Sequence, residues 1–104
     1  MTTRDGRDFR KLFERAEAAG HAAAAAIATH GPCGFAWVTV RPGNSPAARY
    51  AQASLGAWRG YRGGMEVWVR GYGQSMARKE TYAEAFAAEL RLAGVDAVAG
   101  SRMD

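Results

Sequence analysis

The sequence predicts a small α/β domain with a three-stranded, largely parallel sheet and the element order α-β-α-β-α-β. Residues 35–41 and 65–70 alternate between aromatic or polar residues and small or β-branched ones, as half-buried strands do. Segments with the apolar periodicity of a helix lie between and before these strands. The pairs Val40-Arg41, Val69-Arg70 and Val98-Ala99 follow one another at intervals of 29 residues. Equal spacing of this kind is typical of parallel strands joined by crossover helices.

The first element is a helix predicted over residues 8–27, with apolar residues at helical spacing. Asp5 or Asp8 can cap its first turn, because a short side-chain oxygen accepts from the free N–H groups there. Gly20 weakens its middle, so two shorter helices are an alternative. Pro32 ends the helical segment, because proline cannot continue a helix and disfavours one before it.

The remaining elements are bounded by capping residues and glycine turns. Ser45 and the proline after it predict the start of a short helix over residues 46–54. Ser75 predicts the start of a longer helix over residues 76–93, and a third strand is expected over residues 95–99. The whole chain is predicted to be one domain, with an N-terminal helical segment over residues 1–33 and a βαβαβ core over residues 34–104.

An alternative fold is α+β with a mixed sheet. Residues 57–64 have the composition of a loop or of a short edge strand. In the alternative, residues 57–61 pair antiparallel with residues 65–69 across the Gly63-Gly64 turn.

Composition limits the compartment and class of the protein. The chain has 104 residues, of which 48% are hydrophobic and 23% charged, as in an ordinary globular domain. Its longest apolar run, residues 22–28, is too short to cross a bilayer, and its N-terminus lacks the apolar stretch of a signal peptide. The single cysteine, Cys33, excludes an internal disulfide framework. We therefore expect a soluble protein of the cytoplasm that does not bind membranes.

Positive charge is concentrated in the middle of the chain. Residues 41–79 hold seven Lys/Arg and one acidic residue, for a net charge of +6, whereas the whole chain has +4. Six of the seven are arginine, which suits bidentate phosphate contacts and stacking better than lysine does. A solvated surface with no ligand would have the same composition.

Two serine-capped helix starts define a candidate anion site. If the strands are parallel, the turns after Arg41 and Arg70 meet at one sheet edge, where open α/β sheets bind ligands. The free N–H groups of the helices after Ser45 and Ser75 would then point at the same anion. The predicted ligand-binding residues are Arg41, Ser45, Arg70, Gln74, Ser75, Arg78, Lys79 and Arg102. The alternative is that both serines are ordinary caps.

A second candidate is an aromatic sheet face. Period-two alternation places Trp37 with Phe35, Thr39 and Arg41 on one face, and Trp68 with Glu66 and Arg70 on the same face of the next strand. On an open sheet, Trp37 and Trp68 would stack with bases. If helices cover both faces, the two indoles belong to the core instead.

The sequence offers little for catalysis or for cofactors. One cysteine and two histidines are too few for a usual structural zinc site. No family signature surrounds Cys33 and His30, and no phosphate-loop or dinucleotide motif is present. We expect no enzymatic activity, no catalytic residue, no metal and no cofactor.

Several short motifs resemble a family of small bacteriophage and prophage proteins. The resemblance covers residues 34–104 and leaves the N-terminal helix outside. Its motifs are residues 34–38, 63–69, 73–80, 85–87 and 100–104. It implies a phage accessory protein made in the cytoplasm of a bacterial host, but it implies no functional residues.

The combined prediction is a non-enzymatic accessory binding protein for an anionic partner, either nucleic acid or a phosphate-bearing small ligand. The alternative is a protein–protein interaction module, acting as an inhibitor of a host protein or as a subunit of a homo-oligomer. Three Trp, four Tyr and four Phe in so short a chain favour that alternative, because aromatic residues often anchor protein interfaces.

Overall fold

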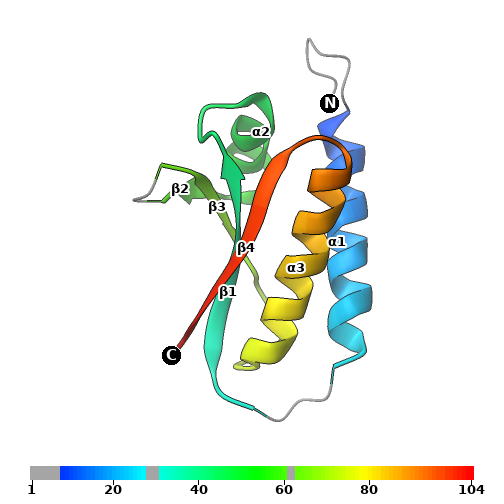
Figure 1. The fold of residues 1–104 in the computed structure, drawn as a ribbon, viewed down its shortest axis with the longest axis vertical. Coiled ribbons are helices and arrows are strands. Elements are labelled where there is room, and N and C mark those ends of the chain that lie inside the picture. Colours follow the sequence, from blue (N-terminus) through cyan, green and yellow to red (C-terminus); the bar gives the residue numbers. More distant parts are fainter. Residues whose placement is uncertain (1–7, 28–30, 61–62) are drawn as a thin grey trace.

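The computed structural model describes residues 8–27, 31–60 and 63–104. These residues form three helices and four strands, which Figure 1 shows in chain order. The elements are α1 (Phe9–Ala25), β1 (Gly34–Arg41), α2 (Pro46–Leu55), β2 (Trp58–Arg59), β3 (Met65–Trp68), α3 (Met76–Leu92) and β4 (Asp96–Met103).

The sheet has four strands in the order β2-β3-β1-β4, and each neighbouring pair is antiparallel. Trp37 of β1 lies opposite Trp68 of β3 and, on its other side, opposite Gly100 of β4. The prediction of a three-stranded, largely parallel sheet is therefore wrong, and the fold is α+β. The hairpin of the alternative fold is present, since Trp58 of β2 pairs with Glu66 of β3, although no described strand pair is parallel.

A short hairpin explains why the equal strand spacing was misleading. After α2 the chain first forms β2 and then turns back, so β3 runs opposite to β1. From β3 through α3 to β4 the chain does make a crossover between two strands of the same direction. However, β1 lies between them and is antiparallel to both. The equal spacing along the chain thus indicated the crossover from β3 to β4, but it did not indicate that β1 lies between these two strands.

The predicted helix caps are confirmed. Asp8 accepts a hydrogen bond from the backbone N–H of Lys11 at 3.2 Å at the start of α1. The Ser45 and Ser75 hydroxyls do the same for α2 and α3. Gly56 ends α2 with φ of 67°, a left-handed conformation that glycine adopts without steric cost. The helix boundaries therefore follow from the capping residues beside them.

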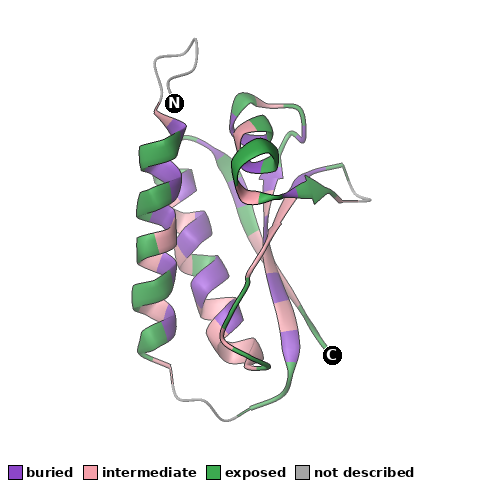
Figure 2. Cartoon of the chain, turned by 180° about the vertical axis from the view of Figure 1, so that it is seen from behind, coloured by how far each residue is buried: buried purple, intermediate pink, exposed green. Residues whose placement is uncertain are grey.

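The three helices lie on one side of the sheet (Figures 1 and 2). α3 packs over β1 and β4, α1 packs against α3, and Tyr50 of α2 makes ring contacts with Phe9 and Phe13 of α1. The core between these layers contains Ala36, Val38 and Val40 of β1, which are at most 1% exposed. No helix among the described residues covers the opposite face of the sheet. None of the described helices has the length and apolar character needed to span a membrane.

Candidate functional site

The uncovered side of the sheet carries a cluster of aromatic residues, which we call the tryptophan face. Each strand contributes alternate residues to it, because successive side chains of a strand point to opposite faces. The tryptophan face consists of Phe35, Trp37, Thr39, Arg41, Trp58, Glu66, Trp68, Asp96, Val98, Gly100 and Arg102. Much of it lines a depression of about 680 Å³.

Three indoles form a continuous row across the sheet. The ring of Trp68 stacks on Trp37 with centroids 4.9 Å apart and on Trp58 with centroids 5.7 Å apart. Phe35 contacts the middle ring of the row, with its ring centroid 5.9 Å from that of Trp68. Trp58 is 48% exposed, while Trp37 and Trp68 are partly buried by one another and by the sheet. Trp37 and Trp68 are thus neither part of the core beneath the helices nor fully exposed to solvent.

Local contacts fix the orientation of the two central rings. A Cβ atom on Gly100 would lie 2.7 Å from Cε2 of Trp37, so only glycine leaves room for this indole to lie over β4. The Nε1–H group of Trp68 donates a hydrogen bond to Oε1 of Glu66 at 3.0 Å. Both rings are therefore held in place by contacts within the protein.

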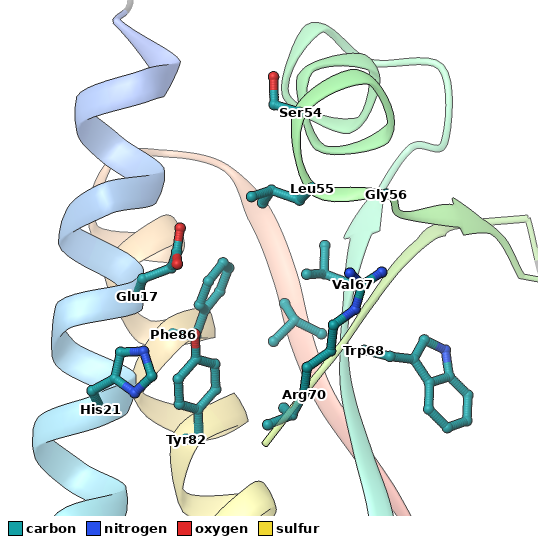
Figure 3. Close-up of a pocket in the computed structure, with 12 residues that line it drawn as sticks. Glu17, His21, Ser54, Leu55, Gly56, Val67, Trp68, Arg70, Tyr82 and Phe86 are labelled. Atoms are coloured by element: carbon teal, nitrogen blue, oxygen red, sulfur yellow. The ribbon is translucent and has the colours of Figure 1, made fainter. Parts of the chain in front are cut away.

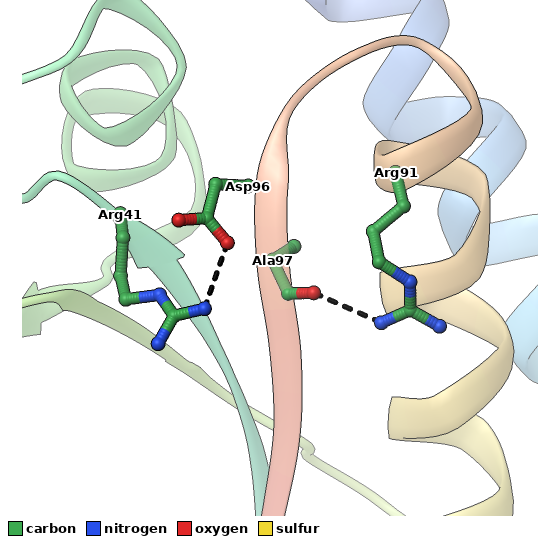
Figure 4. A network of polar contacts seen from close by, with 4 residues as sticks. All are labelled: Arg41, Arg91, Asp96 and Ala97. Atoms are coloured by element: carbon green, nitrogen blue, oxygen red, sulfur yellow. Dashed lines mark hydrogen bonds and ion pairs between the residues drawn. The ribbon is translucent and has the colours of Figure 1, made fainter.

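Two arginines lie on the tryptophan face. The guanidinium of Arg102 lies 5.6 Å from the ring centroid of Phe35 and 5.8 Å from that of Trp68. Arg41 instead donates to Asp96 at 2.8 Å, an exposed ion pair shown in Figure 4. With Glu66 and Asp96 also on this face, its formal charges balance, and Arg102 is the arginine of the face whose charge has no carboxylate partner among the described residues.

The antiparallel sheet separates the two predicted helix starts. Ser45 follows the end of β1, whereas Ser75 forms a bridge with Cys33 just before β1 begins. The eight residues of β1 lie between them, a distance of roughly 25 Å at the usual rise per residue. Arg41 and Arg70 are separated in the same way, so the predicted residues do not form a single anion site.

Most members of the predicted anion site have a structural partner. Lys79 is only 7% exposed, and its Nζ donates to the carbonyl of Gly34 at 3.1 Å. Arg78 donates through Nε to the carbonyl of Ile27 at 3.1 Å. The backbone carbonyl of Gln74 accepts from the N–H of Gly34. Ser75, Gln74 and Arg78 still line a small cavity of about 330 Å³ beside Cys33, but Arg70 and Lys79 are not among its lining residues.

Sequence reasoning paired Trp37 with Trp68 but placed Trp58 in a separate loop, whose mixture of arginine, aromatic residues and glycine is typical of loops that contact nucleic acids and equally of a hairpin turn. The signal for Trp58 was available, because the alternative hairpin places residue 58 opposite residue 66 and therefore beside Trp68. Arg70 was predicted to lie on the aromatic face, yet it follows the end of β3 and lines a cavity on the helical side. His30, weighed as a partner of Cys33, lies outside the described residues.

The described residues contain no group of three His, Cys, Asp or Glu side chains that could hold a metal ion. No protein-family model, curated protein or solved structure matches this chain, so the case for a function rests on the geometry of the tryptophan face.

Proposed function

We propose that this protein binds single-stranded nucleic acid on the tryptophan face and catalyses no reaction. The observation that supports the proposal is the row of stacked indoles, Trp58, Trp68 and Trp37, on a sheet face that no described helix covers. Aromatic side chains on open sheets stack with unpaired bases, and each stacked base contributes roughly 1–3 kcal/mol to binding.

The geometry favours a single strand over a duplex. In a duplex the faces of the bases are covered by their neighbours, so a row of rings can stack only with unpaired bases. Arg102 lies against two of the rings, and a guanidinium can both stack and donate to a phosphate oxygen. Single-stranded DNA or RNA thus matches both the rings and the free charge of the face.

The proposal is tested by fluorescence anisotropy with labelled single-stranded DNA, single-stranded RNA and duplex DNA at low salt. The informative variant is Trp58→Ala, since Trp58 is exposed on the two-residue edge strand and its removal leaves no core cavity. We expect it to weaken single-strand binding about tenfold, as the loss of one stacked base predicts. Leu92→Ala is the matched control, because Leu92 is an apolar residue of α3 that is 82% exposed away from this face.

Binding to single strands should also quench tryptophan emission, because bases stack on the outer indoles of the row, Trp58 and Trp37, between which Trp68 is stacked. The proposal fails if no oligonucleotide binds at low salt, or if Trp58→Ala and Leu92→Ala bind equally well. If the wild-type protein instead self-associates through a contact that Trp58→Ala removes, the tryptophan face is a protein interface.

A further inference from the structure

A separate cavity of about 420 Å³ lies on the helical side of the sheet. It is bounded by α1 and α3 on one side and by β3 and the end of α2 on the other, as Figure 3 shows. Its lining residues are Glu17, His21, Val38, Ser54, Leu55, Gly56, Val67, Trp68, Val69, Arg70, Tyr82 and Phe86. Its volume is within the range of about 300–1,000 Å³ typical of small-molecule sites.

The cavity exists because the helical layer is narrower than the sheet. α1 and α3 approach closely, since a Cβ atom on Gly20 would lie 2.7 Å from Cδ2 of Tyr82. α3 packs over β1 and β4, and α1 packs against α3, so these two helices leave β3 largely uncovered. Val67 and Val69 of the β3 segment, which an additional helix would have buried, remain partly exposed to the cavity.

The walls are mostly apolar and uncharged. Leu55 and Val67 face the ring of Phe86 across the cavity (Figure 3), and Val38 is a further apolar residue of the lining. Burial, reinforced by the nearby charge of Glu17, raises the pKa of Tyr82 to about 12. Tyr82 is therefore neutral at any physiological pH, and its ring contributes apolar surface to the same wall as Phe86.

One cation of the lining is available to a ligand. Arg70 has no hydrogen-bond or ion-pair partner among the described residues. Its guanidinium lies beside Gly56 at the end of α2, where a Cβ atom would come within 3.0 Å of Nη2. Glu17 lies on the opposite wall, on α1. His21, also on α1, is held by a hydrogen bond between its Nδ1 and the Tyr72 hydroxyl.

We propose that this cavity binds a small amphiphilic carboxylate. The apolar body lies against Val67, Phe86 and the ring of Tyr82, and the carboxylate pairs with Arg70. An arginine is well suited to this role, because its planar fork donates two parallel hydrogen bonds to one carboxylate. Glu17 repels an anion at the far wall, so the ligand has one favoured orientation. Trp68 borders this site, but its indole points away from Phe86 and Tyr82 (Figure 3). The other residues of the lining lie outside the tryptophan face, and the proposal does not depend on nucleic-acid binding.

The test uses anilinonaphthalene sulfonate, an aromatic anion whose emission rises in apolar sites, as the probe. We expect one probe to bind per chain and to be displaced by decanoate. Decylamine, which has the same chain length and the opposite charge, should compete at least tenfold less well. Titrations are made well below the melting temperature, where circular dichroism shows each variant to be folded.

Two variants locate the probe, each with a matched control. Val67→Phe fills the cavity and should abolish probe binding, whereas Val98→Phe adds the same ring to the tryptophan face and should not. Arg70→Gln should weaken decanoate competition at least fivefold, whereas Arg49→Gln, on the exposed side of α2, should leave it unchanged.

The proposal is overturned if the probe does not bind, if Val67→Phe binds it as the wild type does, or if decylamine competes as well as decanoate. It is also overturned if folded Arg70→Gln retains full decanoate competition. Oligonucleotide binding is measured on the same variants. If Val67→Phe and Arg70→Gln bind oligonucleotides as tightly as the wild type does, the cavity and the tryptophan face are separate sites. Either proposal can then fail without the other.

Discussion

At the scale of single residues, Lys79 is the position at which sequence reasoning and structure differ most. Its place in the first turn of α3, where a cation opposes the helix dipole, suggested a ligand contact. In the structure it is the buried charged residue of the described core, and its Nζ reaches the carbonyl of Gly34 and lies 5.2 Å from the ring centroid of Phe35. Lys79 therefore ties α3 to the start of β1.

We expect Lys79→Ala to lower the free energy of unfolding by about 2 kcal/mol, because the substitution leaves a cavity and an unpaired carbonyl on Gly34. Arg78→Ala, which loses one hydrogen bond to Ile27 near the surface, should cost less than about 1 kcal/mol. Urea denaturation of both variants measures the difference. Equal midpoints for Lys79→Ala and the wild type would show that the lysine has no structural role.

At the scale of elements, the boundaries were predictable and the strand directions were not. Asp8, Ser45 and Ser75 marked the helix starts, because capping depends on residues within one turn. Strand direction depends instead on the two-residue strand β2, which is too short for a periodic signal. The same limit applies to the candidate site. The alternation of side chains along the strands was enough to pair Trp37 with Trp68. The positions of Trp58 and Arg70 could be predicted only from the order and directions of the strands.

The close packing of α1 on α3 gives a prediction for an element contact. Gly20→Ala gains roughly 0.5–1 kcal/mol of helix propensity, but the added Cβ atom overlaps the ring of Tyr82. That ring is only 9% exposed and is packed between His21 and Phe86, so it cannot move without disturbing them. Because overpacking costs about 1–3 kcal/mol, we expect a net destabilisation of about 1 kcal/mol.

Thermal unfolding of Gly20→Ala measures this balance, and Ala18→Gly on the exposed side of α1 measures helix propensity alone. A higher melting temperature for Gly20→Ala than for the wild type would contradict the close contact between α1 and α3. It would also mean that this contact is not what leaves the cavity beside β3.

At the scale of the whole molecule, folding disperses the basic central segment. Arg41 pairs with Asp96, Arg49 lies on α2, and Lys79 is buried. Arg59 points toward the turn at Gly43, where a Cβ atom would lie 3.3 Å from its Nη1. The tryptophan face has two arginines and two carboxylates, so the described cations of residues 41–79 do not gather on one surface.

This dispersal predicts a weak salt dependence for single-strand binding. The logarithm of the binding constant falls with the logarithm of salt concentration with a slope of about −0.7 for each phosphate neutralised on a single strand. With Arg102 as the unpaired cation of the tryptophan face, we expect a slope of about −0.7, whereas contact with the whole basic segment would give about −4. Arg102→Gln should bring the slope close to zero, and Arg49→Gln should not change it. Anisotropy titrations over a series of salt concentrations measure the slope, and a value near −4 would mean that the strand leaves the tryptophan face and continues over α2.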